Sequence, residues 1–186
     1  MTVTGAIFCG GKSTRMGMDK ALLEVAGTPM YQRIEIAMVD AGVSEVVALG
    51  GTELISLRKI NDYEAGKGPL SALIGGLSSV GSLLVCPCDV PKISATGLKQ
   101  ILARALETEA MAVIAKSNHL EPLIGFYSQS CLPTLTSAWA AGTRAPKDAL
   151  KLLDYETVNF EISEVLNVNR MSDLLSARTQ LGLDLP

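Results

Sequence analysis

Short apolar runs alternate with longer amphipathic segments along this chain of 186 residues. Strands buried on both faces of a sheet are apolar nearly throughout, whereas helices that cover a sheet carry apolar residues at intervals of three and four. The pattern therefore predicts strands over residues 3–9, 45–49, 82–86, 111–115, 123–127 and 157–160. It predicts helices over residues 29–41, 69–80, 96–108, 129–141, 146–153 and 172–181.

Residues that favour helix ends support two of these predictions. Pro29 is expected at the first helical position after Thr28 as the N-cap, and Gly42 is expected to end that helix. The helix 69–80 likewise begins with a proline and is followed by Gly81. Local sequence thus predicts the bounds of both helices.

The alternation of strands and helices predicts one domain spanning residues 1–186. Its expected fold is a three-layer α/β/α sandwich with a mostly parallel, Rossmann-like sheet. In such sheets, ligands bind at the carboxyl ends of the strands. A polar motif that directly follows a predicted strand is therefore a candidate functional site.

Composition and charge exclude several classes of function. The formal net charge is −3, whereas sequence-blind binding to nucleic acid requires a basic surface. No apolar run approaches the roughly 18 residues of a transmembrane helix. The first nine residues, MTVTGAIFC, lack the basic start and long apolar stretch of a signal peptide. We therefore expect a cytoplasmic protein that binds neither nucleic acid nor membrane.

The cysteines do not form a recognisable metal motif. Cys86 and Cys88 flank one proline, and Cys9 and Cys131 lie far from them in the sequence. A zinc ribbon needs two well-spaced pairs of ligands, and the chain adds one histidine, His119. We expect reduced, partly buried thiols.

The stretch CGGKSTRMG at residues 9–17 follows the first predicted strand and resembles a phosphate-binding loop. It is not a P-loop, because the pattern G-x-x-x-x-G-K-[ST] would require glycine where Ala6 stands. It is not a dinucleotide-binding fingerprint either, because Lys12 and Arg15 occupy the positions of its second and third glycines. A different phosphate-binding arrangement is needed to explain this stretch.

The residues of this loop nevertheless suit a polyphosphate. Gly10 and Gly11 allow backbone amides to approach a ligand closely. The planar guanidinium of Arg15 matches phosphate geometry, and Lys20 adds a compact positive charge. The alternative is a solvated turn that carries incidental basic residues.

Asp89 follows the apolar run at residues 82–86 and the short segment Pro87-Cys88. A carboxylate at the end of a strand can hold Mg²⁺, a hard cation that prefers oxygen ligands. The alternative is an aspartate that caps the turn before Pro91. Position alone does not separate these two interpretations.

Residues 10–23, GGKSTRMGMDKALL, closely resemble the signature of nucleotidyltransferases with a glycosyltransferase-A-like fold. Within that group they most resemble the molybdenum cofactor guanylyltransferases. Further segments similar to motifs of this family extend the resemblance over nearly the whole chain: 68–70, 86–91, 121–123 and 167–169.

The resemblance implies a sheet of the nucleotide-diphospho-sugar transferase type and an Mg²⁺-dependent enzyme. Such an enzyme transfers GMP from GTP to molybdopterin, releases pyrophosphate and forms the molybdopterin guanine dinucleotide cofactor. It would make transient contact with cofactor-synthesis proteins or molybdoenzyme chaperones. By resemblance, Asp89 carries the metal, and the catalytic residues are Arg15, Lys20 and Asp89. The resemblance also implies that the nucleotide is bound by Phe8, Gly10, Gly11, Lys20, Asp62 and Asp89. It implies that the acceptor is bound by Asn167, Asn169 and Arg144.

One residue favours GTP over CTP. The guanylyl subgroup has glycine at the position of Gly10, where related cytidylyltransferases carry alanine, and the missing methyl would make room for a purine. The chain departs from some family members at residues 49–51, Leu-Gly-Gly, where an asparagine contacts the base. Backbone amides of the two glycines could replace that contact.

Other functions remain open on the sequence. A cytidylyltransferase for the same cofactor or a sugar-phosphate nucleotidyltransferase would use the same chemistry on other substrates. A non-catalytic cofactor carrier or chaperone partner would bind the pterin without turning over a nucleotide. Asp62 could equally be a surface-loop residue, and Asn167 and Asn169 could be ordinary turn residues.

Overall fold

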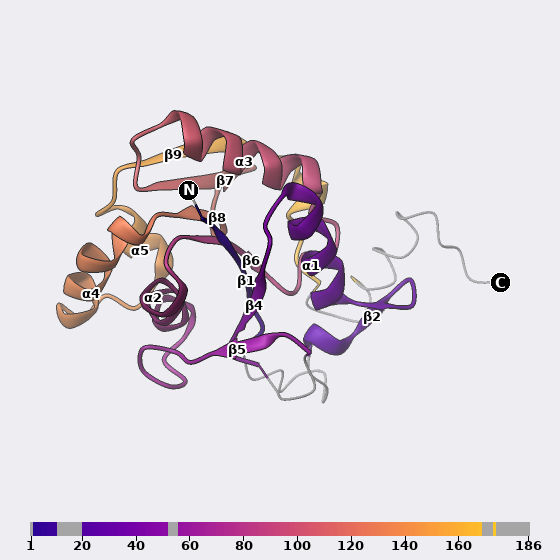
Figure 1. The fold of residues 1–186 in the computed structure, drawn as a ribbon, viewed down its shortest axis with the longest axis horizontal. Coiled ribbons are helices and arrows are strands. Elements are labelled where there is room, and N and C mark those ends of the chain that lie inside the picture. Colours follow the sequence, from indigo (N-terminus) through magenta and orange to yellow (C-terminus); the bar gives the residue numbers. More distant parts are fainter. Residues whose placement is uncertain (1, 11–19, 52–55, 169–172, 174–186) are drawn as a thin grey trace.

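The computed structural model describes residues 2–10, 20–51, 56–168 and 173. In this part of the chain, a seven-stranded sheet has the order β5-β4-β1-β6-β8-β7-β9 (Figure 1). Strand β8 is antiparallel to both of its neighbours, and all other pairs are parallel. The strands of this sheet are β1 (Thr4–Phe8), β4 (Val46–Leu49), β5 (Arg58–Ile60), β6 (Leu83–Pro87), β7 (Ala112–Lys116), β8 (Leu120–Tyr127) and β9 (Tyr155–Asn159).

Helices cover both faces of this sheet, which confirms the predicted three-layer architecture (Figure 1). One face carries α1 (Met30–Ala41) and α3 (Ala95–Glu107). The other carries α2 (Pro69–Val80), α4 (Leu132–Ala140) and α5 (Pro146–Leu150). Short 3₁₀ helices lie at η1 (Lys20–Leu22), η2 (Gln129–Cys131) and η3 (Ile162–Glu164).

Strand β1 lies at the centre of both core layers. All five of its residues are buried, and successive side chains point to opposite faces. Ile7 therefore packs with α1 and α3, whereas Ala6 and Phe8 pack under α2. This double burial explains why the strand reads as a continuous apolar run.

The start of α1 differs from the prediction. Thr28 and Pro29 form β3 (Thr28–Pro29), which pairs with β2 (Glu24–Val25) in a separate two-stranded sheet. The N-cap is Pro29 rather than Thr28, and no side chain caps the helix. The hairpin turn explains the difference, because Ala26 and Gly27 have φ of 59° and 70° and direct the chain into β3.

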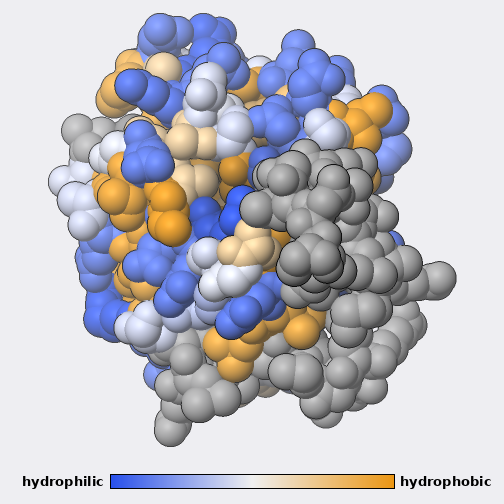
Figure 2. Space-filling model, turned by 90° about the vertical axis from the view of Figure 1, so that its right-hand side faces the viewer, coloured by the Kyte–Doolittle hydropathy of each residue, from blue (hydrophilic) through white to orange (hydrophobic). Residues whose placement is uncertain are grey.

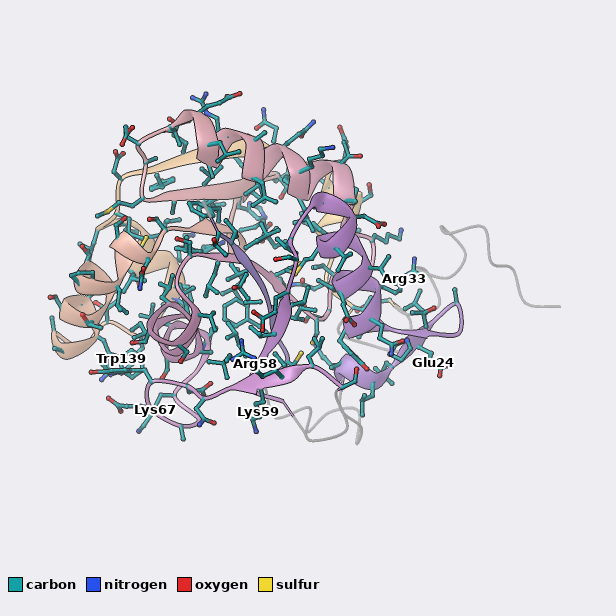
Figure 3. All side chains as sticks on the ribbon, viewed as in Figure 1. Glu24, Arg33, Arg58, Lys59, Lys67 and Trp139 are labelled. Atoms are coloured by element: carbon teal, nitrogen blue, oxygen red, sulfur yellow. The ribbon has the colours of Figure 1, made fainter. Side chains whose placement is uncertain are left out.

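Strand β5 is polar and lies at the edge of the sheet, so its sequence did not predict it. Arg58 and Lys59 are exposed (Figure 3), and Ile60 is buried. Arg58 Nη2 lies 2.6 Å from Glu45 Oε1, on the segment that leads into β4. An edge strand pairs on one side and needs few apolar residues, which hides it from an apolar-pattern search.

Other predicted elements shift by a few residues. The helix predicted over 129–141 divides into η2 and α4 near Pro133, and the helix predicted over 146–153 ends at Leu150. The strand predicted over 157–160 spans β9 instead, two residues earlier at its start. The helix predicted over 172–181 lies outside the described residues except for Asp173, which is helical.

The four cysteines fall within the described residues, and each is buried, where partial burial was predicted. No helix in the described ranges is long and apolar enough to cross a membrane.

Candidate active site

The carboxyl ends of four adjacent parallel strands bring several predicted site residues into one row. In the order β5, β4, β1 and β6, the residues that follow these strands include Asp62, Gly50, Gly10 and Asp89. Backbone hydrogen bonds hold the row together: Gly10 N donates to Leu49 O at 3.2 Å, and Gly50 N donates to Ile60 O at 3.4 Å. On the other side of β1, Cys88 N donates to Phe8 O at 3.2 Å. The predicted location at the carboxyl edge is confirmed.

The loops after β1 and β4 approach each other very closely. A Cβ added to Gly50 would lie 3.1 Å from the Cα of Gly10 and 3.9 Å from Asp62 Oδ1. Gly50 also has φ of 70°, and Gly51 has φ of 89°, so both favour glycine. The glycine pair that departs from the family's asparagine thus permits this close approach.

Lys20 and Asp89 form an ion pair at the β6 end of this row. Lys20 Nζ lies 3.5 Å from Asp89 Oδ2, and the two side chains are 24% and 20% exposed. Burial raises the pKa of Asp89, and the charge and hydrogen bond of Lys20 offset part of this effect. The Asp89 carboxylate is therefore a partly desolvated anion that another cation would stabilise.

A small apolar cluster supports this ion pair. Its residues come from the η1–β2 segment, the start of α1 and the chain near residue 168: Leu23, Val25, Met30 and Val168. Arg33 on α1 adds two hydrogen bonds, from Nε to Pro91 O at 3.2 Å and from Nη1 to Val25 O at 3.5 Å (Figure 3). Arg33 thus joins the hairpin to the loop after Asp89. Sequence reasoning missed it, because a single arginine on an amphipathic helix carries no motif.

The segment that carries Asn167, on the predicted acceptor side, reaches Asp89 through its backbone. The adjacent Val168 N donates to Asp89 O at 2.7 Å, and the Val168 side chain is buried. Asn167 itself is exposed. The structure therefore brings the segment that carries Asn167 to the ion pair, although the two are far apart in the sequence.

Arg144 has a different placement. Its guanidinium carbon lies 3.9 Å from the centroid of the Trp139 ring, and Nη1 donates to Trp139 O at 2.8 Å and to Thr143 O at 2.9 Å. The helices α4 and α5, which flank Arg144, lie at the opposite end of the molecule from β2 (Figure 1). The structure thus does not bring Arg144 to the Lys20–Asp89 pair.

Phe8 is the only described residue among four further predicted site residues. The side chain of Phe8 is 7% exposed and belongs to the core beneath α2. Gly11, Arg15 and Asn169 lie outside the described residues. Of the core residues predicted from helical faces, Trp139 and Met38 are both buried.

The chemistry of the described residues fits Mg²⁺ better than a tightly bound transition metal. Within residues 2–10, 20–51, 56–168 and 173, no three histidine, cysteine or acidic side chains cluster as metal ligands. Mg²⁺ commonly takes one or two carboxylates and completes its shell with waters and substrate phosphates, so Asp89 would suffice on the protein side.

Cys86, in β6 next to this site, is fully buried. Burial, followed by the charges of Asp89 and Cys88, raises the pKa of Cys86 well above its ordinary value. Both features disfavour the thiolate, which is the reactive form of cysteine.

The surface on the β2 side of the molecule is mixed. Among the described residues on this face, Figure 2 shows hydrophilic and hydrophobic side chains interspersed. Such a surface is compatible with a polar ligand that also has flat apolar rings.

The sequence matches the MobA-like NTP transferase domain over residues 5–158. The chain belongs to this family. Membership makes it a nucleotidyltransferase and agrees with the glycine, lysine and aspartate arrangement at the sheet edge.

Curated relatives match this chain over most of its length. A protein from Pelotomaculum thermopropionicum, named a probable molybdenum cofactor guanylyltransferase, is 33% identical over 96% of this chain and 93% of its own. A protein of the same name from Flavobacterium johnsoniae is 31% identical over 93% and 95%. A molybdenum cofactor guanylyltransferase from Pseudomonas fluorescens is 31% identical over 82% and 80%.

Solved structures share the MobA-like fold. Molybdopterin-guanine dinucleotide biosynthesis protein A from Archaeoglobus fulgidus superposes with a TM-score of 0.80 at 21% identity, covering 97% of this chain and 99% of that one. The 2-C-methyl-D-erythritol 4-phosphate cytidylyltransferase from Thermus thermophilus superposes with a TM-score of 0.73 at 14% identity, covering 98% and 100%. These likenesses confirm the predicted fold type of nucleotidyltransferases.

Proposed function

We propose that this chain transfers GMP from GTP to molybdopterin, releasing pyrophosphate and forming the molybdopterin guanine dinucleotide cofactor. The observation that carries the proposal is the Lys20–Asp89 pair at the carboxyl edge of the sheet, next to the loops that carry Gly10 and Gly50. The family and the names of its relatives supply the substrate class.

The geometry suggests how the nucleotide lies. The glycine turn at residues 50–51 and Asp62 lie at the β4–β5 end of the row, and the Lys20–Asp89 pair lies next to β1 and β6. We place the guanosine at the first end, where backbone amides and a carboxylate can read a base. The base and ribose then reach as far as Gly10, beside Gly50, and the triphosphate runs on toward Lys20. Gly11 and Arg15 complete the phosphate contacts that the sequence predicts.

In the proposed reaction, a phosphate oxygen of molybdopterin attacks the α-phosphorus of GTP. A new phosphorus–oxygen bond forms, the bond between the α-phosphorus and its bridging oxygen to the β-phosphate breaks, and pyrophosphate leaves with that oxygen. An ionised phosphate needs no general base, so the residues contribute positioning and charge stabilisation. Lys20 would neutralise the charge that develops on the leaving pyrophosphate.

Asp89 would hold Mg²⁺ in this enzyme. Bound there, the metal would supply charge neutralisation on the phosphates that approach each other. The pKa of Asp89 is raised because burial disfavours its charged form, and a bound cation would offset that cost. The fit rests on one described carboxylate, which is the usual protein contribution to a magnesium–nucleotide site.

The acceptor would bind on the Asn167 side, where Val168 is hydrogen-bonded to the backbone of Asp89. Asn169 extends this side in the sequence. Arg144 is not part of the proposal, because its guanidinium stacks on Trp139. Transient contact with cofactor-synthesis proteins or molybdoenzyme chaperones, and a cytoplasmic location, stay predictions of the sequence.

The direct test incubates the protein with molybdopterin, Mg²⁺ and each of the four ribonucleoside triphosphates, and identifies products by mass. The expected product is the guanine dinucleotide, with pyrophosphate released in equal amount. A cytosine dinucleotide as the main product would identify the cytidylyltransferase alternative. Tight pterin binding without any dinucleotide would identify a carrier.

Gly10→Ala tests how the base or ribose is accommodated. A Cβ at this position would lie 3.7 Å from the nearest atom, the Cα of Gly50, so the protein accepts the methyl without a clash. We expect an unchanged melting temperature, a KM for GTP raised about tenfold, and a smaller change for CTP, because one methyl group in a pocket discriminates by this order.

A comparison of kcat/KM for GTP and CTP in wild type and variant measures this effect. The melting temperature of Gly10→Ala, measured beside that of wild type, controls for a loss of folding, because Gly10 is not among the glycines with positive φ. An unchanged GTP-to-CTP ratio in Gly10→Ala would remove Gly10 as the basis for purine preference.

A further inference from the structure

We infer that Trp139 is a positioning residue for the nucleotide, acting through Glu64 on the loop 61–68 that carries Asp62. The inference rests on the proposed function for its substrate, GTP. It assigns a role at the nucleotide site to α4, a helix that carries no residue of the reaction described above.

Trp139 is held in one orientation by contacts on several sides. The indole is 4% exposed, and its Nε1 donates to Glu64 Oε1 at 2.6 Å. Tyr63 meets the ring edge-to-face, with ring centroids 6.3 Å apart and planes at 86°. Arg144 lies over the ring and is hydrogen-bonded to the Trp139 carbonyl. A cation over an indole face and a donor bonded to a carboxylate are both stabilising, so the ring is a firm anchor.

The anchored residue belongs to a turn that orients Asp62. Lys67 N donates to Glu64 O at 3.3 Å and closes the turn, within which Gly66 N donates to Asp62 Oδ2 at 3.2 Å. Figure 3 shows Trp139 beside the segment that carries Lys67. The contacts thus run from the indole to Glu64, through the turn, to the carboxylate of Asp62.

The first half of the loop has its own attachment to α2. Glu64 N donates to Ser71 Oγ at 2.7 Å, and Ser71 Oγ donates back to Glu64 O at 2.8 Å. A Cβ on Gly75 would lie 2.2 Å from Asn61 O, so the loop lies directly on the helix. The backbone up to Glu64 is therefore fixed without Trp139, and losing the indole bond should loosen the turn after Glu64 rather than unfold the loop.

Asp62 Oδ1 lies 3.9 Å from a Cβ placed on Gly50, so the Trp139–Glu64 contact would set the shape of the guanosine end of the site. The reacting phosphorus lies at the other end, next to Lys20 and Asp89. An interaction with the non-reacting part of a substrate, equally strong in ground and transition states, changes KM and leaves kcat nearly constant. A general loss of folding would instead lower activity for all substrates together.

The test uses two variants that remove one partner each. Trp139→Phe keeps an aromatic ring but loses the N–H donor, and Glu64→Ala removes the acceptor from an exposed side chain with little risk to folding. For each, we expect the KM for GTP to rise about fivefold to tenfold, as for one lost hydrogen bond to a charged group, with kcat and the KM for molybdopterin within about twofold of wild type. The double variant should match the single ones, because both remove the same bond.

Tyr127→Phe is the matched control. It also loses an aromatic donor, since Tyr127 Oη lies 2.6 Å from Pro122 O, but it does so inside β8. It should lower the melting temperature without raising the KM for GTP. Single variants whose KM for GTP stays within about twofold of wild type would overturn the inference. A double variant in which the free-energy effects of Trp139→Phe and Glu64→Ala on KM simply add would also overturn it.

Binding without turnover separates this inference from the proposed function. Trp139 is the one tryptophan in the sequence, so its fluorescence reports on this site alone. Titrating GTP in the absence of molybdopterin should change the emission of wild type, and Glu64→Ala should need about fivefold to tenfold more GTP. An emission change that is identical in wild type and Glu64→Ala would overturn the inference even if the enzyme makes the dinucleotide. Absence of dinucleotide with the Glu64-dependent change intact would overturn the proposed function alone.

Discussion

Asp89→Asn is expected to lower the rate of guanine dinucleotide formation by a factor of about a thousand or more. The asparagine side chain keeps the shape of the residue but loses the charge that would hold Mg²⁺ at the end of β6. Removal of one preorganised electrostatic element from an active site costs about a hundredfold to a thousandfold, and loss of the metal adds to it. The measurement is the initial rate of pyrophosphate release with GTP, molybdopterin and saturating Mg²⁺.

The same substitution should make the folded protein more stable at neutral pH. Burial raises the pKa of Asp89 more than Lys20 lowers it, so the folded state holds this proton to higher pH than the unfolded state does. The contribution of Asp89 to the free energy of unfolding therefore falls as the pH rises above the ordinary value of 3.8. We expect the melting temperature of Asp89→Asn to exceed that of wild type at pH 7 and to approach it as the pH falls below 3.8, where the carboxyl becomes protonated in both states.

Asp148→Asn is the matched control for both measurements. Asp148 also pairs with a lysine, with Lys151 Nζ at 2.7 Å, but both side chains are exposed. Lys151 lowers the pKa of Asp148, so its charge is favoured by the fold rather than opposed. Its loss should leave turnover unchanged and should not raise the melting temperature. An active Asp89→Asn enzyme would exclude Asp89 as the metal ligand.

Lys20→Ala is expected to lower turnover by about a hundredfold or more, because the α- and β-phosphates lose a fixed positive charge in a partly buried site. It should also change the pH dependence. Lys20 is the largest cause that lowers the pKa of Asp89, so its removal raises that pKa further. The acid side of the rate–pH profile should therefore move to higher pH in the residual activity of the variant.

The two substitutions should have opposite effects on stability. Lys20→Ala leaves the Asp89 carboxylate buried without this partner, so the melting temperature at pH 7 should fall, whereas Asp89→Asn should raise it. Lys99→Ala, at an exposed lysine of α3, controls for the loss of one positive charge and should change neither rate nor stability. Near-normal turnover of folded Lys20→Ala would contradict the mechanism.

Elements with strong local signals were predictable from the sequence. The bounds of α2 were predicted to the residue, since a proline begins it and Gly81 follows it. Strand β1 was predicted within one residue at each end, because burial on both faces leaves a continuous apolar run. The rule that ligands meet the carboxyl ends of parallel strands then located Gly10 and Asp89 without any coordinates.

Pairing that depends on distant residues was not predictable in this way. Strand β5 and the β2–β3 hairpin are short and partly exposed, and they form because a neighbouring strand supplies hydrogen bonds rather than because their own sequences favour them. The antiparallel direction of β8 likewise depends on how the chain returns between β6 and β7. The apolar run that predicts a strand does not indicate whether that strand is parallel or antiparallel to its neighbours.

Fold class, family resemblance and the chemical character of the site could be predicted from the sequence, since they depend on apolar periodicity and on which residues follow which strands. Which of those residues meet could not, because that depends on the packing of segments far apart in the chain. Packing joins Lys20 to Asp89 across 69 positions, brings the segment that carries Asn167 to them, and stacks Arg144 on Trp139 instead. A side chain carries its charge and donors wherever it lies, whereas its partner and the pKa of a carboxyl group depend on the residues packed around it.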